Sequence, residues 1–194
     1  MRAEESFWAW FSSIENTLFQ MNEEREELFF EIKSHLEEMS PYLTFEIGPN
    51  REGKRDFVLS VGGVEDAMSW VSQLMNFAPR FEKWNLIPYR PRRKIDFGVE
   101  FNGITILPNQ IHFHYEKQPD GTLELDLYLN GLEDYSQELR EEMVDLVVEN
   151  LLGEFDKHFR VKEQRVHFGP SLSPHLLPIL ELPGVVDSLK KVRT

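Results

Sequence analysis

The stretch IHFHYEKQPDGTLELDLYLNGLED, residues 111–134, decides the predicted fold. Apolar and polar residues alternate on both sides of the segment QPDG, in which proline, aspartate and glycine all favour turns. This pattern predicts two antiparallel strands joined as a β-hairpin. The spacing of apolar residues then becomes helical, so we predict a long helix from about Tyr135 to Phe155 and a further strand near residues 162–168.

The same order of elements is predicted earlier in the chain, between about residues 42 and 90. Two strands flank the segment PNREG, an apolar stripe of helical spacing follows, and a strand is predicted from Trp84 to Arg90. At one constant spacing the two regions match: Phe45 with Phe113, Gly53 with Gly121, Leu59 with Leu127, Gly63 with Gly131, and Glu65-Asp66 with Glu133-Asp134. At a longer spacing, FEK at residues 81–83 matches FDK at residues 155–157. We interpret these matches as two diverged copies of one β-β-α-β unit, with chance similarity of two hairpin-helix patterns as the alternative.

Two helices are predicted before the first copy, and a proline-rich tail after the second. Apolar residues recur at helical spacing in two runs: Phe7, Phe11, Ile14 and Leu18, then Leu28, Ile32, Leu36 and Met39. Asn22 is the predicted cap of the second helix, and Asn102-Gly103 predicts a further hairpin between the copies. Four prolines, from Pro170 to Pro183, predict that the tail runs extended over the surface before a short terminal helix.

The predicted fold class is α+β, with a mainly antiparallel sheet built from two pseudo-repeated β-β-α-β units and preceded by an N-terminal helical hairpin. The helices of the two copies should cover one face of this sheet. The expected domains are residues 1–40, the helical hairpin packed on the main domain; residues 41–168, the α+β domain; and residues 169–194, the tail. Within the main domain, the first repeat spans about 42–90, the linker strands about 95–107 and the second repeat about 110–168.

The composition of the chain limits its function classes. With a formal net charge of −13, the chain would be repelled by polyphosphate and by anionic membranes, so we expect no nucleic acid and no membrane among its partners, which should be neutral or basic. No run approaches the roughly 18 apolar residues of a transmembrane helix, and the first residues lack the basic start of a secretory signal. The absence of cysteine excludes disulfides and thiolate chemistry, so the expected localisation is cytoplasmic.

The polar face of the second hairpin is the first candidate site. Alternation places its polar residues on one face, where we predict His114 opposite Glu124 and His112 opposite Asp126, with His167 of the last strand beside them. Histidines facing a carboxylate across a sheet can supply ligands to a divalent metal, or act as general acid and base. The candidate metal ligands are His112, His114, Asp126 and His167. The alternative is ordinary cross-strand pairing of histidine with carboxylate, which stabilises an exposed face.

Two further groups of residues are candidates for binding. Four basic residues follow one another in an otherwise acidic chain, and extended backbone between prolines would let them bind an anion: Arg90, Arg92, Arg93 and Lys94. The alternative is a solvated loop that pairs with the chain's own glutamates. Trp8 and Trp10 lie on different sides of the first helix, so an exposed tryptophan could mark an interaction surface, with core packing as the alternative.

Motifs of common enzyme classes are absent from the sequence. It contains no G-x-S-x-G, no glycine-rich phosphate loop, no G-x-G-x-x-G and no H-E-x-x-H, and no residue is assigned a catalytic role. We therefore expect a non-enzymatic binding or protein-interaction module that contacts a protein partner or a second copy of itself. The alternative is a metal-dependent, hydrolase-like enzyme that uses the histidine and carboxylate face. No cofactor is predicted, although the pattern is compatible with a divalent metal.

Overall fold

The computed structural model describes residues 2–20, 26–169 and 175–190 of the chain. The chain divides into two compact units, residues 1–90 and residues 91–194, and each has its own hydrophobic core. The α+β class is confirmed. The predicted single sheet is wrong, because the described strands of each copy pair only within their own unit. The division at residue 90 also differs from the predicted domain boundaries at residues 40 and 168.

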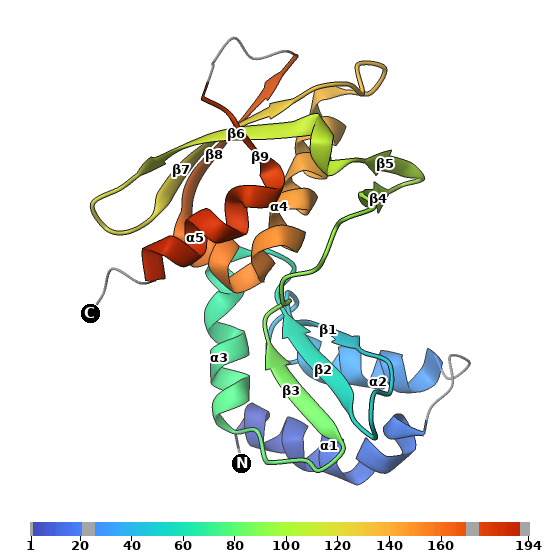
Figure 1. Cartoon of the computed structure of the whole chain (residues 1–194). Helices are drawn as coiled ribbons and strands as arrows, with labels where there is room; N and C mark the ends of the chain where they lie inside the picture. The colour runs from blue at the N-terminus through green and yellow to red at the C-terminus, as the bar shows by residue number, and fades with distance from the viewer. Residues whose placement is uncertain (1, 21–25, 170–174, 191–194) are drawn as a thin grey trace. The chain divides into compact units, whose positions relative to one another are not determined.

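The first unit joins the N-terminal helices to the first β-β-α-β copy (Figure 1). Its sheet has the order β1-β2-β3, in which β1 pairs antiparallel with β2 and β2 pairs parallel with β3. The elements are α1 (Ala3–Phe19), α2 (Glu26–Glu37), β1 (Thr44–Ile47), β2 (Arg55–Ser60), α3 (Met68–Asn76) and β3 (Trp84–Pro88). The predicted cap Asn22 and the connection between the first two helices lie outside the described residues.

Aromatic packing joins the helices of the first unit to its sheet. The ring centroid of Phe11 in α1 lies 4.9 Å from that of Phe57 in β2 and 5.8 Å from that of Trp84 in β3. Phe57 and Leu59 are fully buried, and residues two apart on a strand face the same side of a sheet. The apolar stripes of α1, α2 and α3 therefore share one core with this side of the sheet.

The second unit contains the linker strands, the second copy and the tail. The turn at Asn102-Gly103 has φ angles of 52° and 77°, so the predicted hairpin is present with the left-handed geometry that this dipeptide favours. The larger sheet has the order β8-β7-β6-β9. The elements are β4 (Val99–Phe101), β5 (Ile104–Ile106), β6 (Ile111–Lys117), β7 (Leu123–Leu129), α4 (Gln137–Arg160), β8 (Val161–Phe168), β9 (Leu177–Pro178) and α5 (Leu182–Lys190).

Strand pairing confirms the two β-β-α-β units. Phe45 pairs with Leu59 in the first sheet, and their predicted counterparts Phe113 and Leu127 pair in the second. In both units the helix leads to a third strand, parallel to the second. The match of FEK with FDK does not agree with strand pairing, because Phe57 pairs with Leu86 and its counterpart Leu125 pairs with Gln164, which lies further along the chain than that match requires.

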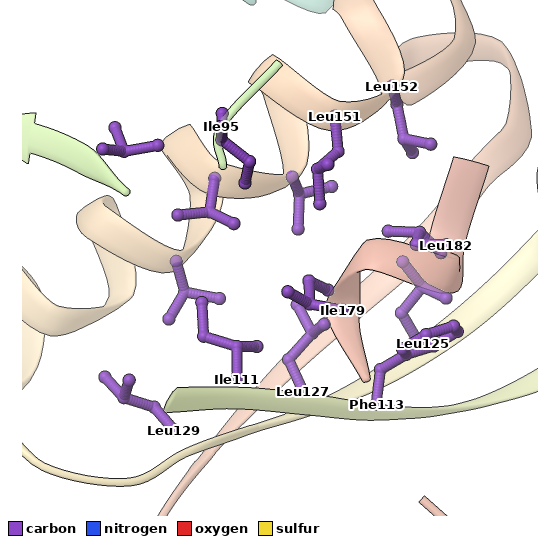
Figure 2. Packing of buried hydrophobic residues seen from close by; sticks show 14 of the residues in the cluster. Ile95, Ile111, Phe113, Leu125, Leu127, Leu129, Leu151, Leu152, Ile179 and Leu182 are labelled. Atoms are coloured by element: carbon purple, nitrogen blue, oxygen red, sulfur yellow. The ribbon is translucent and has the colours of Figure 1, made fainter. Parts of the chain in front are cut away.

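The end of the tail belongs to the core of the second unit and not to its surface. β9 pairs with β6, and Ile179, Leu182 and Val186 are fully buried (Figure 2). α4 and α5 pack together with the inner side of the sheet in one cluster. Pro183 is compatible with α5 because it lies in the first helical turn, where a missing N–H leaves no helical hydrogen bond unmade. Residues 170–174 and Val192 lie outside the described residues.

α4 is broken at Gly153. This residue has φ 72° and ψ 158°, a conformation that is accessible almost only to glycine. Its neighbours Leu151 and Leu152 pack into the core, so the break occurs in the middle of the buried face of the helix. The predicted helix is therefore present, but as two helical segments that meet at this residue.

We predict opposite effects from two glycine-to-alanine substitutions in the second unit. Gly153→Ala should lower the free energy of unfolding by about 1–3 kcal/mol, because alanine is strained at this backbone conformation. Gly184→Ala should raise it by about 0.5–1 kcal/mol, because Gly184 lies in α5, has open space around its Cα and only reduces helix propensity. Urea denaturation measures both, and equal effects of the same sign would contradict the assignment of the break to backbone strain.

Candidate functional site

Polar side chains form three rows across β6, β7 and β8 on the side of the second sheet opposite α4. We call this side the outer face. Strand register gives the rows as His112, Tyr128 and His167; His114, Asp126 and Arg165; and Glu116, Glu124 and Glu163. The residues between them on β7 are buried in the core, which fixes the polar set on the other side. The outer face predicted from the alternation is therefore present.

The predicted register of the hairpin is wrong by one pair. His114 lies opposite Asp126, and His112 lies opposite Tyr128. The turn centres on Asp120 and not on Pro119, because the Asp120 carboxylate accepts hydrogen bonds from the backbone N–H of Thr122 at 2.9 Å and from its hydroxyl at 2.6 Å. Such an aspartate turn shifts which residues face each other across the strands.

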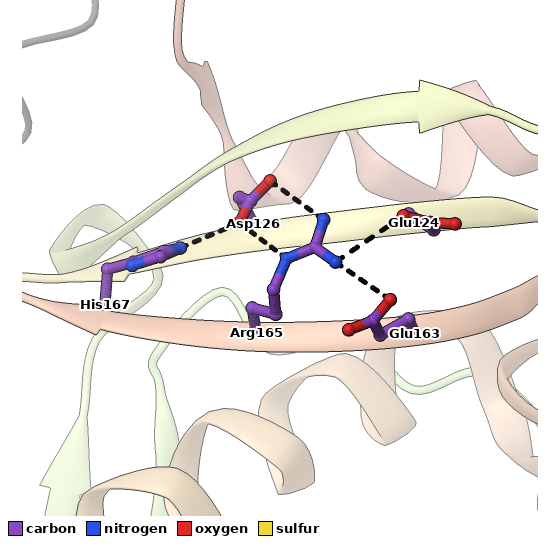
Figure 3. Close-up of polar contacts among 5 residues, drawn as sticks. All are labelled: Glu124, Asp126, Glu163, Arg165 and His167. Carbon is purple, nitrogen blue, oxygen red and sulfur yellow. Dashed lines mark hydrogen bonds and ion pairs between the residues drawn. The ribbon is translucent and has the colours of Figure 1, made fainter.

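Arg165 links the carboxylates of the outer face (Figure 3). Its Nε lies 3.1 Å from Oδ1 of Asp126, and its Nη1 lies 2.8 Å from Glu163 and 3.5 Å from Glu124. His167 Nε2 lies 2.7 Å from the same Asp126 oxygen. Hydrogen bonding from Arg165, followed by that from His167, holds the pKa of Asp126 below its usual value. Bonds to Asp126 and Glu163 raise the pKa of the Arg165 guanidinium.

Two of the four predicted metal ligands are in contact, namely Asp126 and His167. His114 lies opposite Asp126 on the neighbouring strand, and His112 lies one row away. Within the described residues, no group of three or more histidine, aspartate or glutamate side chains is arranged to hold a metal ion. Both oxygens of Asp126 lie within hydrogen-bond distance of Arg165, so the guanidinium already balances the charge of this carboxylate.

The four basic residues predicted to bind an anion are divided between the two units. Arg90 belongs to the first unit, where its Nε lies 3.1 Å from Glu46. Arg92 belongs to the second unit and donates to both oxygens of Asp187, at 2.9 and 3.0 Å, and to Asp156 at 2.7 Å. Hydrogen bonds that Arg92 donates to these carboxylates, Asp187 first, raise the pKa of Arg92. Lys94 is exposed.

Arg92 and Arg93 donate hydrogen bonds to carbonyl groups next to the break in α4. Arg92 Nε donates to the carbonyl of Leu152 at 3.2 Å, and the backbone N–H of Arg93 donates to the carbonyl of Asn150 at 2.7 Å. Both carbonyls lie within the last turn before Gly153, where the break interrupts the regular helical hydrogen bonds. The basic segment therefore holds α4 and α5 together by pairing with the chain's own groups.

The two candidate tryptophans have different environments. Trp8 is buried, and its indole N–H donates to the carbonyl of Leu74 at 2.7 Å, so this residue belongs to the core of the first unit. Trp10 is half-buried, and its ring centroid lies 4.0 Å from that of His35 in α2. The exposure proposed for one of the two tryptophans is therefore only partial, and it applies to Trp10.

A pocket beside β6 was not predicted. Its volume is about 450 Å³, and we call it the β6 pocket; it is lined by Phe113, His114, Tyr115, Lys117, His175 and Leu177. These lining residues include no aspartate or glutamate. The alternation of β6 identified His114, but the pocket also needs residues of the tail. Because the tail was expected to run over the surface, the sequence showed no signal that would bring His175 and Leu177 to this strand.

Comparison with known proteins assigns the chain to no family. No protein-family model, no curated protein and no solved structure matches it. None of the described helices has the length and apolar character needed to cross a lipid bilayer. The surface chemistry of the second unit is therefore the basis for a functional proposal.

We predict that Asp126 titrates below the ordinary aspartate pKa of about 3.9 and that Arg165→Met raises this pKa. Since the folded-state pKa is the lower one, the contacts of Asp126 stabilise the fold above about pH 4, and this contribution is lost as pH falls through the folded-state pKa. NMR titration of the carboxyl carbon measures the pKa. Lys162→Met, an exposed change on the same strand, is the control. An ordinary pKa in the unsubstituted chain would contradict the contact with Arg165.

Arg92→Met should lower the free energy of unfolding by about 2–3 kcal/mol, because it leaves the mostly buried Asp156 carboxylate without this partner and the carbonyl of Leu152 without this donor. Arg92→Lys keeps the charge but cannot form the paired hydrogen bonds that the guanidinium donates to Asp187, so its effect should be intermediate. Chemical denaturation measures both. Lys94→Met, an exposed neighbouring change, should stay within about 0.5 kcal/mol. An Arg92→Met effect as small as that would show that the contacts of the Arg92 guanidinium contribute little to the free energy of unfolding.

Proposed function

We propose that this chain is a non-enzymatic binding protein that recognises a segment of a protein partner at the β6 pocket. The observation that supports this most is the lining of the pocket: its described residues include one lysine, two histidines and two aromatic rings, and no carboxylate, in a chain with a net charge of −13. A volume of about 450 Å³ lies within the range of roughly 300–1,000 Å³ that is typical of ligand sites.

The lining residues suit recognition of a side chain that is partly apolar and partly anionic. Phe113 is fully buried, and its ring is stacked with that of the half-buried Tyr115 at a centroid distance of 6.0 Å, so it supports the Tyr115 ring, which offers a rigid apolar surface. Lys117 is exposed and His114 is half-buried, so both can reach a ligand while still in contact with water. Such a combination of an aromatic surface and a few polar groups is typical of binding sites.

The arrangement around Asp126 favours binding over catalysis. The Asp126 carboxylate accepts from Arg165 and contacts His167, and cross-strand pairs of this kind stabilise a sheet face. These contacts lower the pKa of Asp126, which makes the carboxylate a weaker general base. This arrangement supports a structural role for Asp126 and favours the β6 pocket as the site of the proposed recognition.

The experiment is selection of a random peptide display library on the immobilised full chain. We expect peptides whose affinity falls at least tenfold on Lys117→Glu, while Lys94→Glu leaves the affinity unchanged. Both changes reverse the charge of an exposed lysine in the second unit, but only Lys117 lines the pocket. Circular dichroism and melting of both variants check the fold.

Selection of no peptide above a blank surface would overturn the proposal. So would selected peptides that bind the Lys117→Glu chain as well as the unsubstituted chain, because they would recognise another surface.

A further inference from the structure

We infer that the segment recognised at the β6 pocket is a turn of a second copy of this chain, residues 95–98, whose Phe97 ring and Asp96 carboxylate enter the pocket. This inference rests on the proposed function and names the partner. Two copies then associate through two different surfaces, the turn of one copy and the pocket of the other.

Phe97 is the most exposed large apolar side chain within the described residues, at 93%. Leu107 is also exposed and lies beside the turn, because a Cβ added to Gly98 would lie 3.1 Å from Cδ2 of Leu107. Aromatic side chains that become buried contribute much of the binding energy of protein interfaces. A single exposed apolar residue is common on protein surfaces, so the support comes from how this ring is held and from what can receive it.

A turn that is fixed to the core holds Phe97. The backbone N–H of Gly98 donates to the carbonyl of Ile95 at 2.9 Å, so Asp96 and Phe97 occupy the two central positions of a four-residue turn. Ile95 and Val99, one on each side, are buried in the core of the second unit. A backbone that is already held in place loses little conformational entropy when it binds.

The chemistry of the turn matches that of the pocket. Asp96 is exposed and directly precedes Phe97, so the turn presents a carboxylate next to an aromatic ring. The pocket offers the Tyr115 ring for apolar contact, with His114 and Lys117 as partners for a carboxylate. A cavity of about 150 Å³ can hold a benzene ring, so the β6 pocket, at about 450 Å³, has room for the ring and for the carboxylate beside it.

The contact requires two copies of the chain. Leu107, beside the turn, is followed by residues 108–110 and then by the start of β6, whereas the pocket extends to Lys117, the last residue of this strand. At about 3.3 Å per residue, β6 extends over about 20 Å. The hairpin of β4 and β5 and the end of β6 accordingly lie at opposite sides of the second unit (Figure 1). The turn of one chain is therefore not beside the pocket of the same chain.

The net charge of the chain does not prevent this association. Two copies repel each other at long range, but at physiological ionic strength charges are screened beyond about 8 Å. Contacts inside the pocket then decide specificity, while the overall charge slows association. An acidic partner differs from the expected neutral or basic one, because the local lining of the pocket and not the net charge sets the requirement.

The experiment is sedimentation velocity of the full chain over a range of concentrations. We expect self-association, and Phe97→Ser and Lys117→Glu should each weaken it at least tenfold. Phe30→Ser and Lys54→Glu are the matched controls and should leave it unchanged, since they alter an exposed phenylalanine and an exposed lysine of the first unit. All four changed residues are exposed, so the variants should keep the fold, which circular dichroism and melting check.

Mixing two variants tests whether the turn meets the pocket. Phe97→Ser keeps the pocket, and Lys117→Glu keeps the turn. A mixture of the two, with one of them labelled, should therefore form mixed pairs with the affinity of the unsubstituted contact, although each variant alone associates weakly. Asp96→Lys should also weaken association, and its combination with Lys117→Glu in one chain should restore it, because the charges of turn and pocket are then exchanged.

A chain that stays monomeric at every concentration would overturn the inference, and so would association that Phe97→Ser leaves unchanged. Absence of mixed pairs would overturn the pairing of turn with pocket. In each case, peptides from the display library that depend on Lys117 would leave the proposed function standing, with another protein as the partner. Library peptides that do not depend on Lys117 would overturn both.

Discussion

Burial of the leucine side of β7 against α4 is the interaction on which the second unit depends. Four leucines alternate along this strand with almost no exposed surface, and the apolar face of α4 packs with them in one core: Leu123, Leu125, Leu127 and Leu129. A strand that buries every second residue has no freedom to slip by one position, because a slip would expose the whole apolar set. The side that β7 turns to the core, and with it the composition of the outer face, follow from this constraint.

The same constraint places like charges side by side. Glu116, Glu124 and Glu163 form one row across three strands, and directly opposed like charges destabilise a sheet by roughly 0.2–1 kcal/mol for each pair. Arg165 offsets part of this repulsion through its bonds to two of them. The third, Glu116, lies on β6 opposite Glu124 and is exposed.

The two copies share a topology and differ in the additional helices that pack into their cores. In the first unit, the apolar faces of α1 and α2 cover the same side of the sheet as α3. In the second unit, α5 and the residues before it take a comparable place beside α4, and the fork of Arg92 binds α4 to α5 across the break at Gly153. The packing of α5 beside α4 also brings the tail to β6, so one arrangement accounts for both the stability of the unit and its pocket.

Local pattern was sufficient for most strands and helices and for the repeated β-β-α-β order, because alternation, helical spacing and turn residues such as Asn102-Gly103 act over a few neighbouring positions. The side of the sheet on which His114, Asp126 and His167 lie could be predicted for the same reason. Their partners could not, because the register depends on hydrogen bonds of Asp120 within the turn. The separation into two cores, the burial of Ile179 and the β6 pocket were decided only by the tertiary structure, since each depends on residues that are distant in the chain and meet only when the core forms.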